Sequence, residues 1–195
     1  MSGEYFDAIW ETIPSGHRHH QDDLAALIPA FVGDARDVLD LGCGDGRHLA
    51  ALAGSGAAVT GADRSQLALA RAAERAPTAT LVQVAESERL GLKDNAFDRV
   101  WCAGTIEHVV DTQTVLSEIR RVLRPGGQLL VITPAHTFGT RLKLAFTGWE
   151  HHFDPFSSRL RFYTARSLGS ALDDCGFEVL AIERQGGLLT ARASR

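Results

Sequence analysis

The chain has little of several residue types whose abundance would mark a specialised class of protein. Its 195 residues include only six prolines, one methionine and three cysteines. The cysteines Cys43, Cys102 and Cys175 lie far apart and form no Cys-x-x-Cys pair. This cysteine pattern argues against a disulfide framework and against a structural zinc site. The ordinary globular composition excludes a collagen-like or largely disordered chain.

The sequence also lacks a long apolar run, a secretory signal and an excess of positive charge. No segment approaches the roughly 18 consecutive apolar residues of a membrane span. Residues 1–10 include Glu4 and Asp7 and have no apolar core of the kind found in signal peptides. The net charge is −4, which supplies no general positive field for nucleic acid. We therefore expect a cytoplasmic protein that binds neither membrane nor nucleic acid.

Short apolar segments alternate with segments of helical spacing. Five strand-like runs are predicted at residues 37–41, 57–63, 80–84, 97–103 and 128–133. Helical spacing of apolar residues is clear between 115 and 123, and the sequence Arg-Pro-Gly-Gly at 124–127 predicts the helix stop and a turn. Ser65 is placed to cap a helix that continues through Ala73. This alternation is typical of βαβ units with a mostly parallel sheet.

The C-terminal part predicts one more helix and two final strands. The helix spans residues 167–175, and the strands span 177–183 and about 188–193. The turn at 185–187 is too short for a crossover helix, so the last two strands should be antiparallel. We therefore predict a single α/β domain over residues 1–195. It should contain a seven-stranded, mostly parallel sheet with the last strand antiparallel and helices on both faces. A further packing helix is expected at residues 24–31.

A glycine-rich turn follows the first predicted strand, with the sequence Gly-Cys-Gly-Asp-Gly at residues 42–46. Ligands of open parallel sheets bind at the carboxyl ends of strands, where glycines let the backbone approach a bound molecule. A glycine-rich βα turn without any ligand is the plain alternative. Asp63 closes the second strand and Glu86 follows the third, and a carboxylate at the second strand end can accept both hydroxyls of an adenosine ribose. The plain alternative for each of these acids, taken alone, is a solvated loop residue.

The sequence Val-Leu-Asp-Leu-Gly-Cys-Gly-Asp-Gly-Arg at residues 38–47 resembles the first motif of the class I S-adenosylmethionine-dependent methyltransferases. Further similar segments follow in register at 61–65, 85–90, 94–98, 107–109 and 123–127. The resemblance is to the branch that includes quinone, sugar and natural-product methyltransferases. It implies a Rossmann-like fold, S-adenosylmethionine as the methyl donor and S-adenosylhomocysteine as the product. The implied acceptor is a small molecule, methylated on oxygen in preference to carbon or nitrogen, and the protein would be a monomer or homodimer.

The resemblance also implies roles for particular residues. Asp40 would orient the amino group of the methionine part, and Asp63 would accept the ribose hydroxyls. Arg64 would pack against the adenine. The other implied cofactor contacts are Gly42, Gly44, Glu86, Ser87 and Ala103. Two departures from the family pattern lie on the adenine side: position 86 is Glu instead of Asp, and Leu-Gly-Leu at 90–92 replaces Leu-Pro-aromatic.

Two other readings remain open at this point. A nicotinamide-dependent oxidoreductase would need the spacing Gly-x-Gly-x-x-Gly and a turn that accepts pyrophosphate. Here the third glycine comes one residue early, and Asp45 would repel a phosphate, whereas a sulfonium cation tolerates nearby acids. A non-catalytic protein that keeps the cofactor fold as a binding or regulatory partner is the second alternative.

The acceptor side is expected in an insertion at residues 134–163, which we interpret as a lid. Residues 138–163 contain seven aromatic side chains, which either shape a pocket or pack an extra helix onto the sheet. A hydroxyl acceptor needs a general base, for which the catalytic candidates are His108, His151 and His152. Glu150 and Asp154 flank the His pair, but a loop fixes no metal geometry, and we predict no metal. Residues 1–33 are expected to cap the cofactor.

Overall fold

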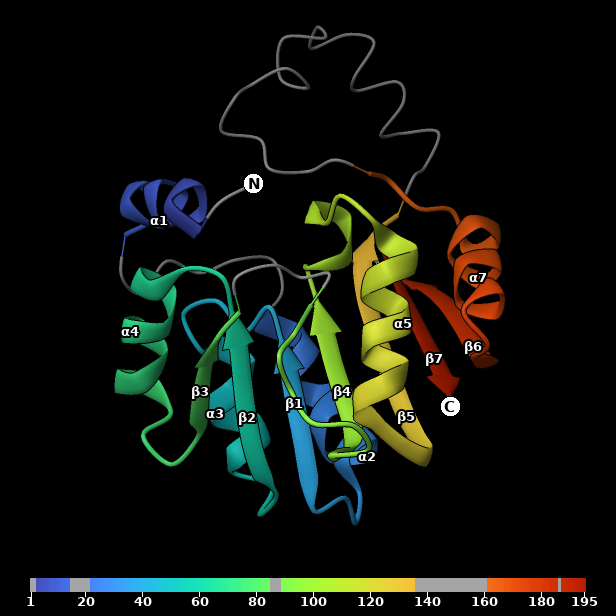
Figure 1. Ribbon diagram of the computed structural model, residues 1–195, viewed down its shortest axis with the longest axis horizontal. Coiled ribbons are helices and arrows are strands. Elements are labelled where there is room, and N and C mark those ends of the chain that lie inside the picture. Colours follow the sequence, from blue (N-terminus) through green and yellow to red (C-terminus); the bar gives the residue numbers. More distant parts are fainter. Residues whose placement is uncertain (1–2, 15–21, 85–88, 136–160, 186) are drawn as a thin grey trace, which may run out of the picture.

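The fold is described here from a computed structural model, which places residues 3–14, 22–84, 89–135, 161–185 and 187–195. A seven-stranded sheet with the order β3-β2-β1-β4-β5-β7-β6 lies at its centre (Figure 1). The strands are β1 (Asp37–Leu41), β2 (Ala58–Asp63), β3 (Thr80–Gln83), β4 (Phe97–Ala103), β5 (Leu123–Pro134), β6 (Glu178–Gln185) and β7 (Leu188–Ser194). β7 runs antiparallel to both of its neighbours, and the pairs among β1 to β5 are parallel. The predicted fold class is confirmed.

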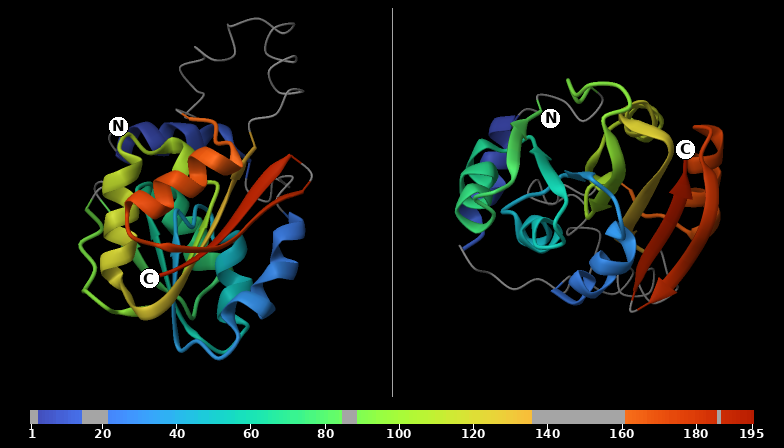
Figure 2. Two further views of the ribbon diagram at one scale, coloured as in Figure 1. Left: turned by 90° about the vertical axis from the view of Figure 1, so that its right-hand side faces the viewer. Right: turned by 90° about the horizontal axis from the view of Figure 1, so that it is seen from below.

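Helices cover both faces of this sheet. They are α1 (Gly3–Thr12), α2 (Ile28–Val32), α3 (Arg47–Ala53), α4 (Gln66–Arg75), α5 (Thr112–Val122) and α7 (Ala165–Asp174), with 3-10 segments η1 (Asp22–Leu27) and η2 (Ile106–His108). In the left view of Figure 2, α5 and α7 lie on one side of the sheet, and α2 and α3 on the other. Successive strand residues alternate between the two cores: Val38 packs with α2 and α3, whereas Leu39 packs with α5 and α7.

Several element boundaries differ from the sequence-based expectation. The expected turn at residues 124–127 belongs to β5, which begins directly after α5. This early start is supported by pairing of Leu123 with Phe97 and by hydrogen bonds that join Arg195 to Gly126 and Gly127. The expected helix at residues 24–31 is instead a 3-10 segment followed by α2. Proline stands in the first turn of α2, where its missing N–H costs no hydrogen bond.

The N-terminal helix α1 lies outside the two core layers. Figure 1 shows it above α4, at the edge of the sheet where the parallel strands end. None of its residues is fully buried, so α1 adds little to the hydrophobic core. Among the described residues, none of the helices has the length and apolar character needed to cross a membrane.

Candidate functional site

The candidate site lies at the carboxyl edge of the sheet and begins with the glycine turn between β1 and α3. Gly42, Gly44 and Gly46 all have positive φ, which L side chains rarely adopt. A Cβ atom on Gly42 would lie 2.0 Å from the Oγ1 atom of Thr105, so this position excludes any side chain. Thr105 in turn donates from its hydroxyl to the Leu41 carbonyl (3.0 Å). The turn is thus held closely between β1 and the end of β4.

Asp40 lies on β1 just before this turn and is 2% exposed. Its Oδ2 atom is buried and has no hydrogen-bond partner among the residues that the structure describes. Burial, and secondly the nearby Asp63 carboxylate, raises the pKa of Asp40 from 3.8 to about 8. A buried carboxyl oxygen without a partner is costly, and a positively charged donor would satisfy it. An amino group beside a sulfonium fits this requirement.

Asp63 closes β2 and faces the glycine turn. Its Oδ2 atom accepts a hydrogen bond from the Gly44 amide (2.8 Å), and its Oδ1 atom accepts one from the Ser65 amide (2.9 Å). Burial raises the pKa of Asp63, while these backbone hydrogen bonds act in the opposite direction. Each carboxylate oxygen can accept more than one hydrogen bond. The side chain is therefore oriented by the backbone and keeps acceptor capacity for two hydroxyl groups.

The charged residues beside Asp63 already have partners within the protein. The Arg64 side chain is largely buried, with its guanidinium carbon 5.1 Å from the centre of the Phe6 ring. Asp45, the acid of the glycine turn, pairs with Arg75 of α4 at 3.0 Å. This ion pair offsets the charge of Asp45, so the turn carries less negative charge than its sequence indicates.

The end of β4 forms the other half of the edge. Ala103 is half-buried there, and the next amide, of Gly104, donates to the Ile132 carbonyl (2.8 Å). His108 ends η2 with its side chain 23% exposed, and its Nε2 atom lies 4.0 Å from Oε1 of Glu107. Glu107 is buried and accepts a hydrogen bond from the Thr133 hydroxyl (3.0 Å). His108 is thus at the expected edge, with a buried carboxylate beside it.

Both described ends of the proposed lid meet at this edge. Ala135 forms a parallel bridge with Tyr163, and the amide of Arg161 donates to the Glu107 carbonyl (3.2 Å). The Tyr163 hydroxyl is bonded to Thr112 (2.8 Å), and burial raises the pKa of Tyr163. The insertion therefore leaves and rejoins the fold next to Glu107.

Four predicted site residues lie outside the described residues. His151 and His152 belong to the range 136–160, and Glu86 and Ser87 belong to 85–88. The predictions made for these four stay predictions. Among the residues that the structure places, no group of three or more His, Cys, Asp or Glu side chains is arranged to hold a metal ion.

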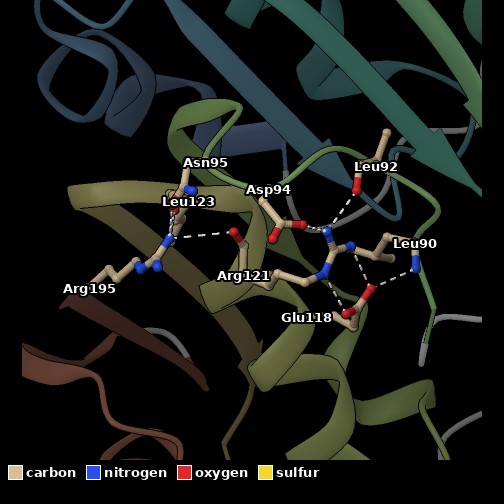
Figure 3. Close-up of polar contacts among 8 residues, drawn as sticks. All are labelled: Leu90, Leu92, Asp94, Asn95, Glu118, Arg121, Leu123 and Arg195. Carbon is tan, nitrogen blue, oxygen red and sulfur yellow. Dashed lines mark hydrogen bonds and ion pairs between the residues drawn. The ribbon is translucent and has the colours of Figure 1, made fainter.

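The chain that follows residue 88 is attached to α5 by a network of charges (Figure 3). Glu118 accepts a hydrogen bond from the Leu90 amide (3.1 Å) and pairs with Arg121 at 2.7 Å. Arg121 also donates to the Leu92 carbonyl (2.8 Å) and pairs with Asp94 at 2.5 Å. Leu90, Leu92 and Asp94, which follow the predicted adenine contacts in the sequence, are thus held against α5.

Sequence reasoning missed several residues that shape this edge. Glu107 lies in a segment that was singled out only for its family motif and for His108, and Thr105 lies just before that segment. Asp7 and Trp10 contact the edge from α1, and they lie more than 30 residues from the glycine turn in sequence. The sequence indicated only that Phe6, Asp7 and Trp10 share one face of a helix, because they are spaced three and four residues apart. It does not indicate which residues that face contacts.

Comparisons with known proteins give a consistent result. A family described as "Methyltransferase domain" matches residues 39–131. The chain is 33% identical over 131 residues to 27-O-demethylrifamycin SV methyltransferase of Amycolatopsis mediterranei, covering 64% of this chain and 47% of that protein. It is 31% identical over 188 residues to an uncharacterized methyltransferase of Synechocystis, covering 91% of this chain and 84% of that protein. The chain therefore spans about half of the first relative and most of the second.

A solved structure shares the fold. It is the 1,6-didemethyltoxoflavin-N1-methyltransferase of Burkholderia thailandensis with bound 1,6-didemethyltoxoflavin and S-adenosylhomocysteine. The TM-score is 0.69 at 19% identity, and the match covers 98% of this chain and 84% of that one. At this identity the likeness concerns the fold alone.

Proposed function

This chain belongs to the S-adenosylmethionine-dependent methyltransferases, and from that membership we propose that it transfers a methyl group to an oxygen of a small molecule. S-adenosylhomocysteine is the product that this reaction releases. The observation that carries the proposal is the buried Oδ2 atom of Asp40, which lacks a partner among the described residues, beside the oriented carboxylate of Asp63. These two acids flank a turn that cannot carry side chains at Gly42.

We assign the cofactor contacts as follows. Asp40 binds the amino group of the methionine part, because its buried oxygen requires a donor and gains most from a cationic one. Asp63 accepts the ribose hydroxyls with the acceptor capacity that its two backbone hydrogen bonds leave. Gly42, Gly44 and Ala103 offer backbone atoms, and Arg64 bounds the adenine side. Glu86 and Ser87 are assigned to the adenine edge on the family resemblance.

When bound, S-adenosylmethionine supplies a methyl carbon that is already activated by its sulfonium. The protein therefore has mainly to align the acceptor and exclude water. His108 is the described candidate for the base that takes the hydroxyl proton, because it lies at the carboxyl edge with a partly exposed side chain. His151 and His152 are alternative bases within the proposed lid, residues 134–163.

Oxygen is proposed as the methylated atom on the names of relatives. The Amycolatopsis relative is named for an O-demethylated rifamycin, and a Klebsiella pneumoniae relative, 35% identical over 102 residues, is named a ubiquinone biosynthesis O-methyltransferase. The toxoflavin enzyme with the same fold is named for methylation of nitrogen. That likeness concerns the fold alone, but the family resemblance also leaves nitrogen open, so an acceptor screen should include amines.

The proposal is tested by titration calorimetry of the purified chain with S-adenosylmethionine and S-adenosylhomocysteine, with NAD as the control ligand. We expect both sulfur ligands to bind and NAD to give no binding heat. Incubation with methyl-labelled donor and a panel of phenols, sugars and amines should then yield a labelled product. Absence of binding by both sulfur ligands would refute the proposed function, and a product labelled only on nitrogen would correct the acceptor atom.

A further inference from the structure

Helix α1 is attached to the start of α4 through one acidic side chain. Oδ1 of Asp7 accepts a hydrogen bond from the Ser65 hydroxyl (2.5 Å) and another from the Leu67 amide (3.1 Å). Ser65 is completely buried and also caps α4 by accepting from the Ala68 amide (3.0 Å). A carboxylate at a helix N-terminus is further favoured by the helix dipole. Asp7 thus connects the N-terminal helix to Ser65, the residue that follows Arg64.

A second contact joins α1 to the glycine turn. A Cβ atom on Gly44 would lie 2.8 Å from Cζ2 of Trp10, so the indole ring rests directly on the backbone of Gly44. Trp10 also contacts Arg71, whose guanidinium carbon lies 6.0 Å from the centre of the indole ring. Arg71 also donates to the carbonyl of Ile13, the residue just after α1 (2.8 Å).

These two contacts converge on Asp63. The Asp63 carboxylate accepts hydrogen bonds from the amides of Gly44 and Ser65. Trp10 contacts Gly44, and Asp7 accepts a hydrogen bond from the Ser65 hydroxyl. On the same helix face, Phe6 packs against Arg64, which lies between Asp63 and Ser65 in the sequence. One face of α1 therefore contacts Gly44 and Ser65, whose amides bind the Asp63 carboxylate.

We propose that Asp7 and Trp10 are positioning residues for the cofactor, which act by holding Ser65 and Gly44 so that Asp63 stays oriented toward the ribose hydroxyls. This inference rests on the proposed function, because it assigns the ribose to Asp63. It gives α1 a role that core packing does not explain, since the helix has no fully buried residue. Loss of the Asp7 contact should therefore loosen the ribose site and leave the folded core intact.

The test measures binding of S-adenosylhomocysteine by calorimetry to the wild type and to Asp7→Ala. We expect about tenfold weaker binding for Asp7→Ala, which is the scale of one charge-assisted hydrogen bond. Glu11→Ala is the matched control, because it removes the same charge from an exposed position of α1 and should leave the affinity unchanged. Asp7→Asn keeps an oxygen that accepts both hydrogen bonds and should restore most of the affinity. Trp10→Ala should weaken binding in the same way as Asp7→Ala.

A double-mutant cycle separates positioning from a general loss of structure. In an Asp63→Asn background, Asp7→Ala should weaken binding by less than about twofold, because the residue through which it acts is already impaired. Thermal unfolding without ligand should stay a single cooperative transition for Asp7→Ala, with Tm lowered by only the few degrees that loss of the Asp7 hydrogen bonds costs.

The outcomes are distinguishable. If the wild type binds no S-adenosylhomocysteine, the proposed function fails and this inference with it. If the wild type binds and Asp7→Ala binds equally well, only the inference is overturned. An equal loss from Asp7→Ala in the presence and absence of the Asp63 carboxylate would also overturn it, because α1 would then act independently of Asp63.

Discussion

At the scale of single residues, Asp40 and Asp63 differ in the hydrogen bonds that the fold offers to their carboxyl groups. Asp63 accepts two backbone hydrogen bonds, whereas Asp40 has a buried oxygen without a partner among the described residues. Backbone donors stabilise the carboxylate form, and burial without donors favours the protonated form. Asp40 is therefore the residue whose protonation state should respond most to a bound cation.

This difference predicts how Asp40 affects stability. Its pKa is raised from 3.8 to about 8 in the fold, by burial first and by Asp63 second. The folded protein then holds a proton that the unfolded chain has lost, so the contribution of Asp40 to stability falls as the pH rises from about 4 to about 8. We expect ligand-free Asp40→Asn to gain stability relative to the wild type between pH 5 and pH 8, as measured by urea unfolding.

The matched control is Asp34→Asn, which changes an exposed carboxyl near the opposite end of β1. It should not alter the pH response of the wild type. If Asp40→Asn and the wild type lose stability in parallel between pH 5 and pH 8, Asp40 is ionised throughout and its burial is offset by donors.

The ribose contact gives a second prediction at this scale. If Asp63 accepts the ribose hydroxyls as proposed, Asp63→Ala removes two charge-assisted hydrogen bonds, so the cofactor should bind more weakly by more than about 1 kcal/mol. Calorimetry with S-adenosylhomocysteine measures this change. An affinity equal to that of the wild type would refute the ribose role.

Sequence reasoning located single residues well where a local pattern defines them. Ser65 was predicted as a helix cap, and the structure confirms it, since its hydroxyl accepts from the Ala68 amide. The same reasoning could not find the Asp7 contact to Ser65, because the two residues are 58 positions apart. Nor could it foresee that Asp45 is paired with Arg75, since that distance is set by the packing of α4 against the turn.

At the scale of elements, α5 anchors the segment that joins β3 to β4. Figure 3 shows the Arg121 side chain between Asp94 and Glu118, with the Leu92 carbonyl also in reach. Arg121 lowers the pKa of Glu118, mainly through their side-chain hydrogen bond. The network ties the chain after the predicted adenine contacts to a helix of the core.

This network predicts an acid-sensitive contribution to stability. Because the pKa of Glu118 is lowered in the fold from its usual 4.5, the contribution is present at neutral pH and is lost as the pH falls below that value. We expect Glu118→Gln to destabilise the protein by about 1 kcal/mol at pH 7, since a partly exposed charge-assisted pair is lost. Urea unfolding at pH 7 and pH 4 should show the deficit shrinking at the lower pH.

Glu74→Gln on the exposed side of α4 is the control for this measurement. It changes the same charge without breaking a described ion pair, so its stability should match the wild type at both pH values. A deficit for Glu118→Gln that stays constant with pH would show that shape, and not charge, holds the segment.

Elements were predictable where apolar periodicity was strong. The strands β1, β2 and β4 lie within one residue of their predicted bounds, and the helix α5 ends one residue before its predicted end but begins three residues earlier than predicted. The start of β5 was wrong, because Arg-Pro-Gly-Gly is typical of a turn but here pairs with the C-terminal residue Arg195. Such pairing joins residues about 70 positions apart, and no local propensity encodes it.

At the scale of the whole molecule, the order of the strands brings the site together. β1 lies between β2 and β4, so Asp40, Asp63 and Ala103 lie near the carboxyl ends of neighbouring strands, at one edge of the sheet. The parallel arrangement could be predicted from the alternation of strands and helices, and the antiparallel β7 from its short turn. Because the proposed ligand contacts three strands and the glycine turn, it should stabilise the fold as a unit.

Binding of the proposed ligand should therefore raise the stability of the whole domain. A ligand present at 100 times its dissociation constant stabilises the folded state by about 2.7 kcal/mol if it binds only that state. For a domain of this size, that corresponds to a rise in Tm of about 5 to 10 °C. We expect S-adenosylhomocysteine to produce such a rise, measured by circular dichroism, and NAD to produce none. A rise with NAD alone would support the oxidoreductase reading, because Asp45 is paired with Arg75 and would then not repel its phosphates.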